Sequence, residues 1–446
     1  MKRNLCILLI LFAIFAFATP SASAQNRYIV RTSGGLGSVL KLCLSANCQV
    51  QGSLDGNIGH TFLVTSQGNL ISNLLGFVGN LLEELLGIES VEADKLLPLP
   101  SPAISTIPPG LSDTTPVDYF GTVVTHGYAT QPATQIIRLT DAQVGFGVSG
   151  SGIVAVIDTG VDVNHPALAP VLLPGYDFTR NQPGASEWLD VPQLNGQTIS
   201  GNSQQNQPVL VQQSSAAILD QSSAAILDNG GGSYTDFGHG TMTTGLVHLA
   251  APTAKILPLK AFSANGTGYL SNIIAALYYA AANNANIVNM SFDIPSQSQA
   301  LNAAVSYANQ HGLILVAAAG NESTSSPVYP AACNPNVMGI ASTTDYDTLS
   351  SFSNYGDIDV WIAAPGEYVI STFPGGTFAA SSGTSFSSPL VAGTADLLMT
   401  VHPGLNQANA ASALAHAVKL TPNLNNGRLD VYQAVSAWVN TPSGQQ

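Results

Sequence analysis

The sequence predicts an α/β protein in which a mainly parallel sheet is flanked by helices in three layers, preceded by a small α+β unit. From about residue 135, short and almost purely apolar strands alternate with helices. That alternation is typical of a parallel sheet buried on both faces. Residues 27–94 form a separate pattern of strands and a helix. A unit of this size can form a small domain of its own.

The larger region supplies the elements of the parallel sheet. We expect strands at 152–157, 256–262, 285–290 and 313–319, and helices at 269–283, 297–311 and 390–401. The strands are continuous apolar runs without a polar face, and the intervening helices are long enough to cross back over the sheet.

The small unit opens with a strand at 27–31, contains a helical stretch at 74–86 and closes with a turn and strand at 87–94. Cys43 and Cys48 are close enough in sequence to form a disulfide in an oxidising compartment. Cys333 has no evident partner, and we interpret it as a small buried side chain.

The composition limits the classes of partner. The chain has 26 acidic and 12 basic residues, for a formal charge of −14, and 45% of its residues are hydrophobic. Nucleic acids and anionic membranes bind basic surfaces, so we expect neither as a partner. The hydrophobic content is sufficient for a large core.

The first 24 residues have the features of a signal peptide. A positive start at Met1-Lys2-Arg3 precedes an apolar run from Leu5 to Ala18, and Ala22-Ser23-Ala24 supplies the small residues that cleavage requires. The run is shorter than the ~20 residues of a membrane span. We therefore expect secretion and no membrane association after cleavage; an uncleaved N-terminal anchor is the alternative.

Two segments break the pattern of strands and helices. Residues 100–132 are rich in Pro, Ser and Thr, which is the composition of a linker. The segment from about 180 to 234 is rich in Gln, Ser, Asn and Gly and contains a tandem repeat at 213–228, so we interpret it as a surface insertion. The predicted domains are therefore 25–99 and 133–446.

Three short signatures stand where an α/β sheet presents an active site. Asp158-Thr159-Gly160 ends a buried strand, Gly238-His239-Gly240-Thr241 opens a helix, and Gly383-Thr384-Ser385 precedes the apolar helix at 390–401. Each one alone also has an ordinary structural interpretation, as a turn, a loop or a helix start. Together they place Asp, His and Ser in the chain order for which subtilisin is the standard case.

With these motifs, and with Pro389 at its family spacing after Ser385, residues from about 135 to 446 resemble the subtilase family of subtilisin-like serine peptidases. Ala318-Ala319-Gly320-Asn321 is similar to the oxyanion-hole segment of that family. The resemblance implies a subtilisin-like three-layer fold and a secreted serine endopeptidase. Its triad would be Asp158, His239 and Ser385.

The chemistry accounts for these residue types. A serine hydroxyl needs a base within hydrogen-bonding reach, and His239 would be that base. Asp158 would hold the imidazole in the required tautomer and stabilise the imidazolium. The backbone N–H of Ser385 and the side chain of Asn321 would form the oxyanion hole.

The resemblance also implies a cleft in which two chain segments pair with the substrate as additional strands. These segments are Gly266-Thr267-Gly268 and Ser291-Phe292-Asp293. The opposite wall of the main specificity pocket would be Ala318-Ala319-Gly320.

Three residues depart from the family pattern. Val328 stands where a small residue often forms the pocket floor, which predicts a shallow pocket for small or medium apolar P1 residues. Asp293 replaces a usual Gly, and two interpretations stay open: it favours a basic substrate residue nearby, or it points to solvent. Phe386 replaces the Met that often follows the nucleophile, which predicts resistance to mild peroxide.

The small unit is similar to the inhibitory propeptide, of ferredoxin-like fold, that precedes subtilases. Its C-terminal tail would occupy the cleft until autocatalytic cleavage between about Leu97 and Pro132. The expected partners are protein or peptide substrates and this intramolecular inhibitor, in a monomer. The chemistry requires no cofactor. A structural calcium ion is compatible with the family, but no residue pattern here supports one, and the remaining histidines lack metal-ligand spacing.

Other functions share parts of this pattern. A catalytically inactive subtilase fold could serve as a binding protein, although no triad or oxyanion residue is lost here. The related carboxyl-serine peptidases share Gly-Thr-Ser but use Asp at the oxyanion position, so His239 and Asn321 argue against that class. A peptide-ligating or strictly processing enzyme would have the same constellation.

Overall fold

The computed structural model describes residues 26–75, 87–99, 108–191, 209–210 and 234–439. The predicted signal peptide, most of the helical stretch at 74–86 and the tandem repeat at 213–228 lie outside the described residues. The chain divides into two compact units. The first comprises Met1–Ser53 and His60–Ala93, and the second comprises Leu54–Gly59 and Asp94–Gln446.

The first unit has a ferredoxin-like arrangement. Its elements are β1 (Asn26–Thr32), α2 (Gly35–Ala46), β2 (Cys48–Ser53), β3 (Thr61–Ser66), α3 (Leu70–Leu75) and β4 (Ile88–Ala93). The strands form an antiparallel sheet in the order β2-β3-β1-β4, which confirms the strands predicted at 27–31 and 87–94. Val39 and Leu42 of α2 pack on Val30, Phe62 and Val64 of the sheet.

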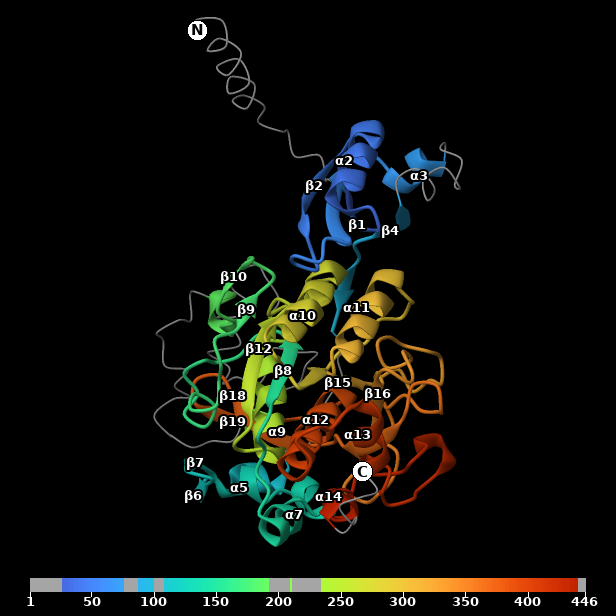
Figure 1. Cartoon of the computed structure of the whole chain (residues 1–446). Helices are drawn as coiled ribbons and strands as arrows, with labels where there is room; N and C mark the ends of the chain where they lie inside the picture. The colour runs from blue at the N-terminus through green and yellow to red at the C-terminus, as the bar shows by residue number, and fades with distance from the viewer. Residues whose placement is uncertain (1–25, 76–86, 100–107, 192–208, 211–233, 440–446) are drawn as a thin grey trace, which may run out of the picture. The chain divides into compact units, whose positions relative to one another are not determined.

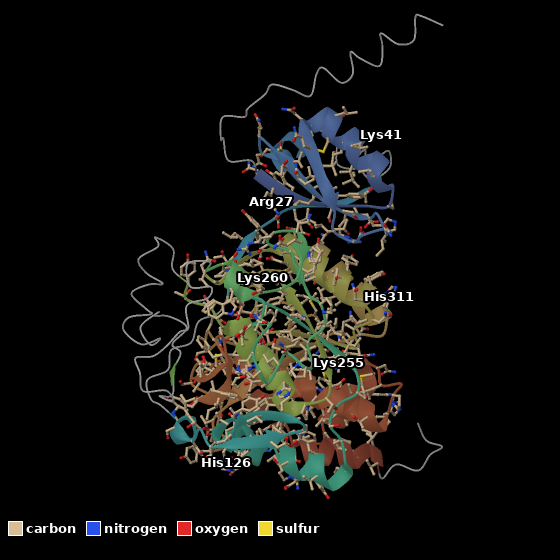
Figure 2. The ribbon with its side chains drawn as sticks, turned by 90° about the vertical axis from the view of Figure 1, so that its left-hand side faces the viewer. Arg27, Lys41, His126, Lys255, Lys260 and His311 are labelled. Atoms are coloured by element: carbon tan, nitrogen blue, oxygen red, sulfur yellow. A yellow bond between two sulfur atoms is a disulfide. The ribbon has the colours of Figure 1, made fainter. Side chains whose placement is uncertain are left out.

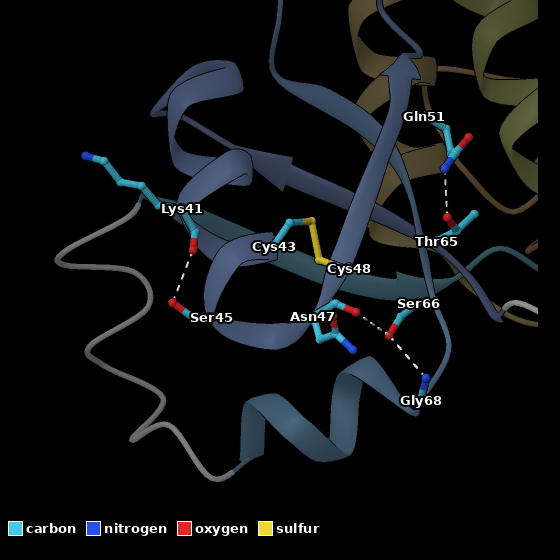
Figure 3. The surroundings of a disulfide bond; sticks show 9 residues. All are labelled: Lys41, Cys43, Ser45, Asn47, Cys48, Gln51, Thr65, Ser66 and Gly68. Atoms are coloured by element: carbon cyan, nitrogen blue, oxygen red, sulfur yellow. Dashed lines mark hydrogen bonds between the residues drawn. A yellow bond between two sulfur atoms is a disulfide. The ribbon is translucent and has the colours of Figure 1, made fainter. Parts of the chain in front are cut away.

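A disulfide joins the end of α2 to the start of β2 (Figure 3). Asn47 ends the helix in the left-handed conformation, with φ 51°. The chain reverses there and brings Cys48 back beside Cys43, with 4.4 Å between their Cα atoms. The bridge that the sequence allowed is therefore present.

The second unit contains an eight-stranded sheet in the order β10-β9-β12-β8-β14-β15-β16-β17. Its strands are β8 (Ile153–Asp158), β9 (Tyr176–Asp177), β10 (Gln182–Pro183), β12 (Lys255–Lys260), β14 (Ile287–Met290), β15 (Ile314–Ala318), β16 (Met338–Thr343) and β17 (Ile362–Pro365). All neighbours from β9 to β17 are parallel, and β10 runs antiparallel to β9. The predicted parallel sheet is confirmed.

Helices flank this sheet in two pairs (Figure 1). One pair is α9 (His239–Ala250) with α12 (Thr384–Val401), and the other is α10 (Leu270–Ala282) with α11 (Gln299–Gln310). α12 is buried along almost its whole length. It begins earlier than the predicted residue 390, because Pro389 lies inside the helix rather than at its start.

Residues 108–136 are folded, although composition predicts a linker as far as 132. They form η1 (Pro109–Ser112), β6 (Pro116–Tyr119), β7 (Thr122–Thr125), α5 (His126–Ala129) and α6 (Pro132–Ile136). Two buried side chains anchor them. The Tyr128 hydroxyl donates to the Gly245 carbonyl at 2.6 Å. The Gln131 amide bonds both the N–H and the carbonyl of Ile370, at 2.8 and 2.7 Å.

The remaining elements complete the second unit. They are β5 (Leu96–Pro98), α7 (Leu139–Phe146), η2 (Glu187–Leu189), β11 (Val209–Leu210), β13 (Thr267–Tyr269), β18 (Val369–Phe373), β19 (Thr377–Ser381), α13 (Gln407–Leu414), η3 (Pro422–Leu424) and α14 (Val431–Val439). At the start of the predicted insertion, Asn181 and Pro183 are exposed, whereas Glu187 is fully buried. Among the described residues, no helix has the length and apolar character to cross a membrane.

Candidate active site

The carboxyl ends of the parallel strands bring the sequence signatures together, as is usual in α/β folds. β8 ends at Asp158, while Ser291 and Asn321 follow β14 and β15. Helices α9 and α12 begin at the same edge, α9 with His239 and α12 with Thr384 followed by Ser385.

Asp158 and His239 form a direct buried pair. The distance from Asp158 Oδ1 to His239 Nδ1 is 2.6 Å. The carboxylate also accepts the backbone N–H of Thr159 at 2.7 Å and the hydroxyl of Thr243 at 3.0 Å. Burial is the largest single effect and disfavours the imidazolium, but the charge and hydrogen bond of Asp158 together with the charges of Asp236 and Glu187 raise the pKa of His239.

Ser385 lies in the first turn of α12. Its hydroxyl donates to the main-chain carbonyl of Ser291 at 3.1 Å. His239 Nε2 is buried and has no hydrogen-bonding partner among the described residues. The neighbouring Phe386 ring lies 5.4 Å from the His239 ring, so the start of α12 is beside the imidazole.

The side chain of Asn321 is held in one orientation. Its Oδ1 accepts the backbone N–H of Thr384 at 2.9 Å and the Thr384 hydroxyl at 3.0 Å. The Thr384 hydroxyl also accepts the N–H of Gly320 at 3.1 Å. Because Oδ1 is engaged in this way, the amide nitrogen Nδ2 is a buried donor without a partner in the described part of the chain.

One segment of the second unit pairs with a predicted substrate-binding strand. β5 runs antiparallel to β13, with Leu97 opposite Gly268 and Pro98 opposite Thr267. The Leu99 N–H continues the ladder to the carbonyl of Gly266 at 2.7 Å. Residues 96–99 therefore occupy one side of the cleft that the sequence assigned to substrate.

The same segment lines a cavity of about 800 Å³ together with Asp293, Glu322 and Val328. Val328 is buried, and its N–H donates to Asp359 Oδ1 at 3.0 Å. Asp293 is half-buried, and its Oδ1 is buried without a hydrogen-bonding partner among the described residues. Burial raises the pKa of Asp293 to about 7, and the charges of Glu322 and Asp359 act in the same direction.

The sequence pattern of the Subtilase family matches residues 150–433. The chain belongs to the subtilase family.

The relatives of this subtilase include named proteinases. The chain is 35% identical over 297 residues to the thermophilic serine proteinase of Bacillus sp. (strain AK1), which covers 65% of this chain and 63% of that protein. It is 33% identical over 295 residues to thermitase of Thermoactinomyces vulgaris, covering 64% of this chain and 89% of thermitase. The match to subtilisin BL of Lederbergia lenta is 40% identical over 153 residues and covers 34% of this chain and 56% of that protein.

One solved structure extends the fold comparison. Fervidolysin from Fervidobacterium pennivorans, described as a keratinolytic enzyme related to subtilisin, matches with a TM-score of 0.67 at 20% identity. The alignment covers 94% of this chain and 62% of fervidolysin. At this identity the likeness supports the fold and nothing more specific.

Two groups that this subtilase places beside the predicted triad were missed from the sequence. The Thr243 hydroxyl bonds Asp158, and the buried ammonium of Lys260 bonds the carbonyl of Thr159 at 2.6 Å. Lys260 also bonds Asp190 and the carbonyl of Phe262, each at 2.7 Å, and it is labelled in Figure 2. The sequence feature that could have indicated Lys260 is a lysine at the end of an apolar strand.

Three further residues that the sequence assigned to the substrate cleft, Phe292, Ala318 and Ala319, are buried. Cys333 is half-buried rather than fully buried, and it donates to Asn302 at 3.2 Å. Within the described ranges, no group of three His, Cys, Asp or Glu side chains has a metal-binding arrangement.

Proposed function

We propose that this subtilase is a secreted serine endopeptidase that hydrolyses peptide bonds through Asp158, His239 and Ser385. The observation that carries the proposal is the buried 2.6 Å contact between Asp158 and His239 beside the N-terminal turn that holds Ser385. This is the arrangement of a base and its orienting carboxylate next to a helix-borne nucleophile.

The proposed reaction begins with a change at Ser385. Its hydroxyl leaves the Ser291 carbonyl by rotation about χ1 and donates to His239 Nε2, which is free to accept. A substrate strand that pairs with residues 291–293 would offer its own N–H to the Ser291 carbonyl. Substrate binding would therefore favour the rotation.

The chemical steps then follow from the residues in place. His239 removes the proton while Ser385 Oγ attacks the peptide carbonyl, and Asp158 stabilises the resulting imidazolium. The oxyanion accepts hydrogen bonds from the Ser385 N–H and from Asn321 Nδ2. His239 gives its proton to the leaving amine, and water hydrolyses the acyl-enzyme by the reverse sequence. No cofactor takes part in these steps.

We further propose that residues 25–99 are an inhibitory propeptide. Two observations support this role: the ferredoxin-like fold of residues 26–93, and the antiparallel pairing of Leu96–Pro98 with a predicted substrate-binding strand. A peptide held in that ladder blocks the approach of a substrate strand. Cleavage between about Leu97 and Pro132 would release it.

Secretion is consistent with two features. The N-terminal 24 residues have the pattern of a signal peptide. The Cys43–Cys48 disulfide is also typical of an oxidising compartment.

We propose that the cavity beside residues 96–99 receives the P1 side chain and that Val328, which lines it, favours small or medium apolar side chains. Asp293 adds a pH-dependent element: burial raises its pKa to about 7 in the chain that includes residues 96–99, which line the same cavity. A peptide library cleaved at pH 6 and at pH 8 tests whether the Asp293 charge acts in the matured enzyme, with Asp293→Asn as control. Preference for Phe or Tyr at P1, or a profile independent of pH and of Asp293, would contradict it.

An assay of peptide-bond hydrolysis distinguishes a serine endopeptidase from a catalytically inactive binding protein. The purified precursor should mature, and the product should degrade an unstructured protein such as casein. Ser385→Ala should do neither. N-terminal sequencing of the matured protein locates the cut. Maturation of Ser385→Ala on its own would show that cleavage is not autocatalytic, and casein hydrolysis by that variant would overturn the proposed nucleophile.

A further inference from the structure

A second buried carboxyl group lies beside the proposed triad. Glu187 is the first residue of η2, has no solvent exposure and belongs to none of the sequence signatures. Burying a carboxylate without partners is costly, so its surroundings indicate what it does.

Four donors converge on Glu187. Its Oε1 accepts the hydroxyl of Thr159 and the backbone N–H groups of Gly238 and Gly240, the latter two at 3.2 Å each. Its Oε2 accepts the hydroxyl of Thr241. Thr159 directly follows Asp158, and the other three residues surround His239. One carboxyl group therefore joins the two chain segments that carry Asp158 and His239.

The direction of these hydrogen bonds is fixed by their neighbours. The Thr159 hydroxyl accepts the N–H of Gly240 at 2.9 Å, and the Thr241 hydroxyl accepts the N–H of Asp162 at 2.8 Å. Each hydroxyl hydrogen is then left for Glu187. All four partners are donors, which favours the ionised carboxylate.

Charged groups on the surrounding elements act on the same carboxyl. Burial has the largest effect and raises the pKa of Glu187 to about 7, while the bonds from Thr159 and Thr241 and the charge of Lys260 oppose the rise and Asp158 adds to it. The groups that face this region are Asp158 at the end of β8, Lys260 on β12, Asp236 shortly before α9 and His239 at the start of α9. Glu187 also helps to raise the pKa of His239.

The turn after Asp158 is held from both sides. Glu187 bonds the Thr159 side chain, and Lys260 bonds the Thr159 carbonyl at 2.6 Å. We propose that Glu187 is a positioning residue for the triad, which ties the Asp158 turn to the first turn of α9 and, in its ionised form, stabilises the His239 imidazolium. This inference rests on the proposed function of Asp158, His239 and Ser385.

The test is the pH dependence of kcat and kcat/KM for Glu187→Gln, with enzyme concentrations set by active-site titration. If a variant precursor does not mature on its own, immobilised wild-type enzyme is used to process it. Glutamine keeps the shape but removes the charge and places a donor opposite the Thr241 hydroxyl. We expect kcat to fall ~10-fold with KM changed less than ~2-fold. The acid limb of kcat/KM should move to lower pH by roughly 0.5 unit, because losing the charge lowers the pKa of His239.

Asp396→Asn is the matched control. Asp396 is also fully buried and accepts two backbone N–H groups, from Ser151 at 2.9 Å and Gly152 at 2.8 Å, but it lies about three turns along α12 from Ser385. It should lose stability while keeping the wild-type acid limb. If Glu187→Gln does not fold, Glu187→Asp keeps the charge and should keep the acid limb while lowering kcat.

The outcomes separate this inference from the proposed function. If Ser385→Ala is active, or if the wild type is inactive, the proposed triad itself is contradicted. If instead the wild type is active and depends on Ser385, Glu187→Gln could still have the same pH profile as the wild type or Asp396→Asn. That result would overturn only the role of Glu187. An acid limb in Glu187→Asp displaced from that of the wild type would overturn the charge effect.

Discussion

The hydroxyl of Ser291 donates to the main-chain carbonyl of Ser385 at 2.8 Å. In a regular helix that carbonyl would accept the N–H of residue 389, but residue 389 is proline and has no N–H. Ser291 therefore replaces a missing helical hydrogen bond at the proposed nucleophile. In return the Ser385 hydroxyl donates to the Ser291 carbonyl at 3.1 Å.

This relationship predicts non-additive effects of two substitutions. Ser291→Ala leaves the buried Ser385 carbonyl without a donor and should cost about 1–3 kcal/mol of unfolding free energy. In a Pro389→Ala background the new N–H can serve that carbonyl, so Ser291→Ala should cost less. Denaturant unfolding of both single variants and the double variant measures the coupling. Equal costs in both backgrounds would show that Ser291 acts elsewhere.

The oriented amide of Asn321 predicts a loss confined to turnover. Asn321→Leu removes the unpartnered donor Nδ2 and should lower kcat strongly with little change in KM. Removal of one such donor from subtilisin costs about 100–1,000-fold in kcat, and we expect a loss of that order. Steady-state kinetics on a peptide substrate provide the measurement. A change mainly in KM would place Asn321 in substrate binding instead.

The absence of a thioether beside the nucleophile predicts resistance to peroxide. Phe386 is fully buried next to Ser385, and the methionines in the described residues, Met242, Met290, Met338 and Met399, are buried as well. Activity should survive mild peroxide treatment, whereas Phe386→Met should become sensitive because the new sulfur can be oxidised. Rapid inactivation of the wild type would show that a different residue is vulnerable.

Because His248 is buried, we predict that the folded protein loses stability in acid. Burial lowers its pKa to about 4, with a smaller contribution from His165. The Tyr128 hydroxyl gives its hydrogen to Gly245 and lies 3.0 Å from His248 Nδ1, while Nε2 has no partner among the described residues. Protonation of Nε2 would bury a charge without an acceptor.

The direction in which stability changes with pH follows from the different pKa of His248 in the folded and unfolded states. Between pH 6.5 and about 4 the unfolded histidine binds a proton and the folded one does not. Stability is therefore full above pH 6.5 and falls by up to about 3 kcal/mol as the pH approaches 4. His248→Phe should have a smaller loss over this range than the wild type in thermal unfolding. Substitution of the exposed His311 is the control, and an equal pH slope in His248→Phe would contradict the prediction.

The positions of Asp158, Asn321 and His239 at one edge of the sheet could be predicted because they depend on short local patterns. Asp158 ends an apolar strand, Asn321 follows one and His239 begins a helix, so parallel strand direction brings them to one edge. The start of α12 was less predictable, because Pro389 marks a helix start in most sequences but here lies within the helix.

Contacts between distant segments could not be read from the sequence. Glu187 stands at the beginning of a polar segment that composition assigns to the surface, yet its four donors come from the Asp158 and His239 turns. Tyr128 and Gln131 likewise fix a segment with linker composition through bonds to Gly245 and Ile370. Such bonds depend on tertiary packing, which has no periodic signal in the chain.

Labelling with a fluorophosphonate tests the central claim most directly, because the probe reacts with a serine only when a base has activated it. The matured enzyme should take up one probe per chain, and mass spectrometry should place the adduct on Ser385. His239→Ala should abolish labelling, as should Ser385→Ala. An adduct on another residue, or peptide hydrolysis by an enzyme that the probe does not label, would contradict the proposed triad.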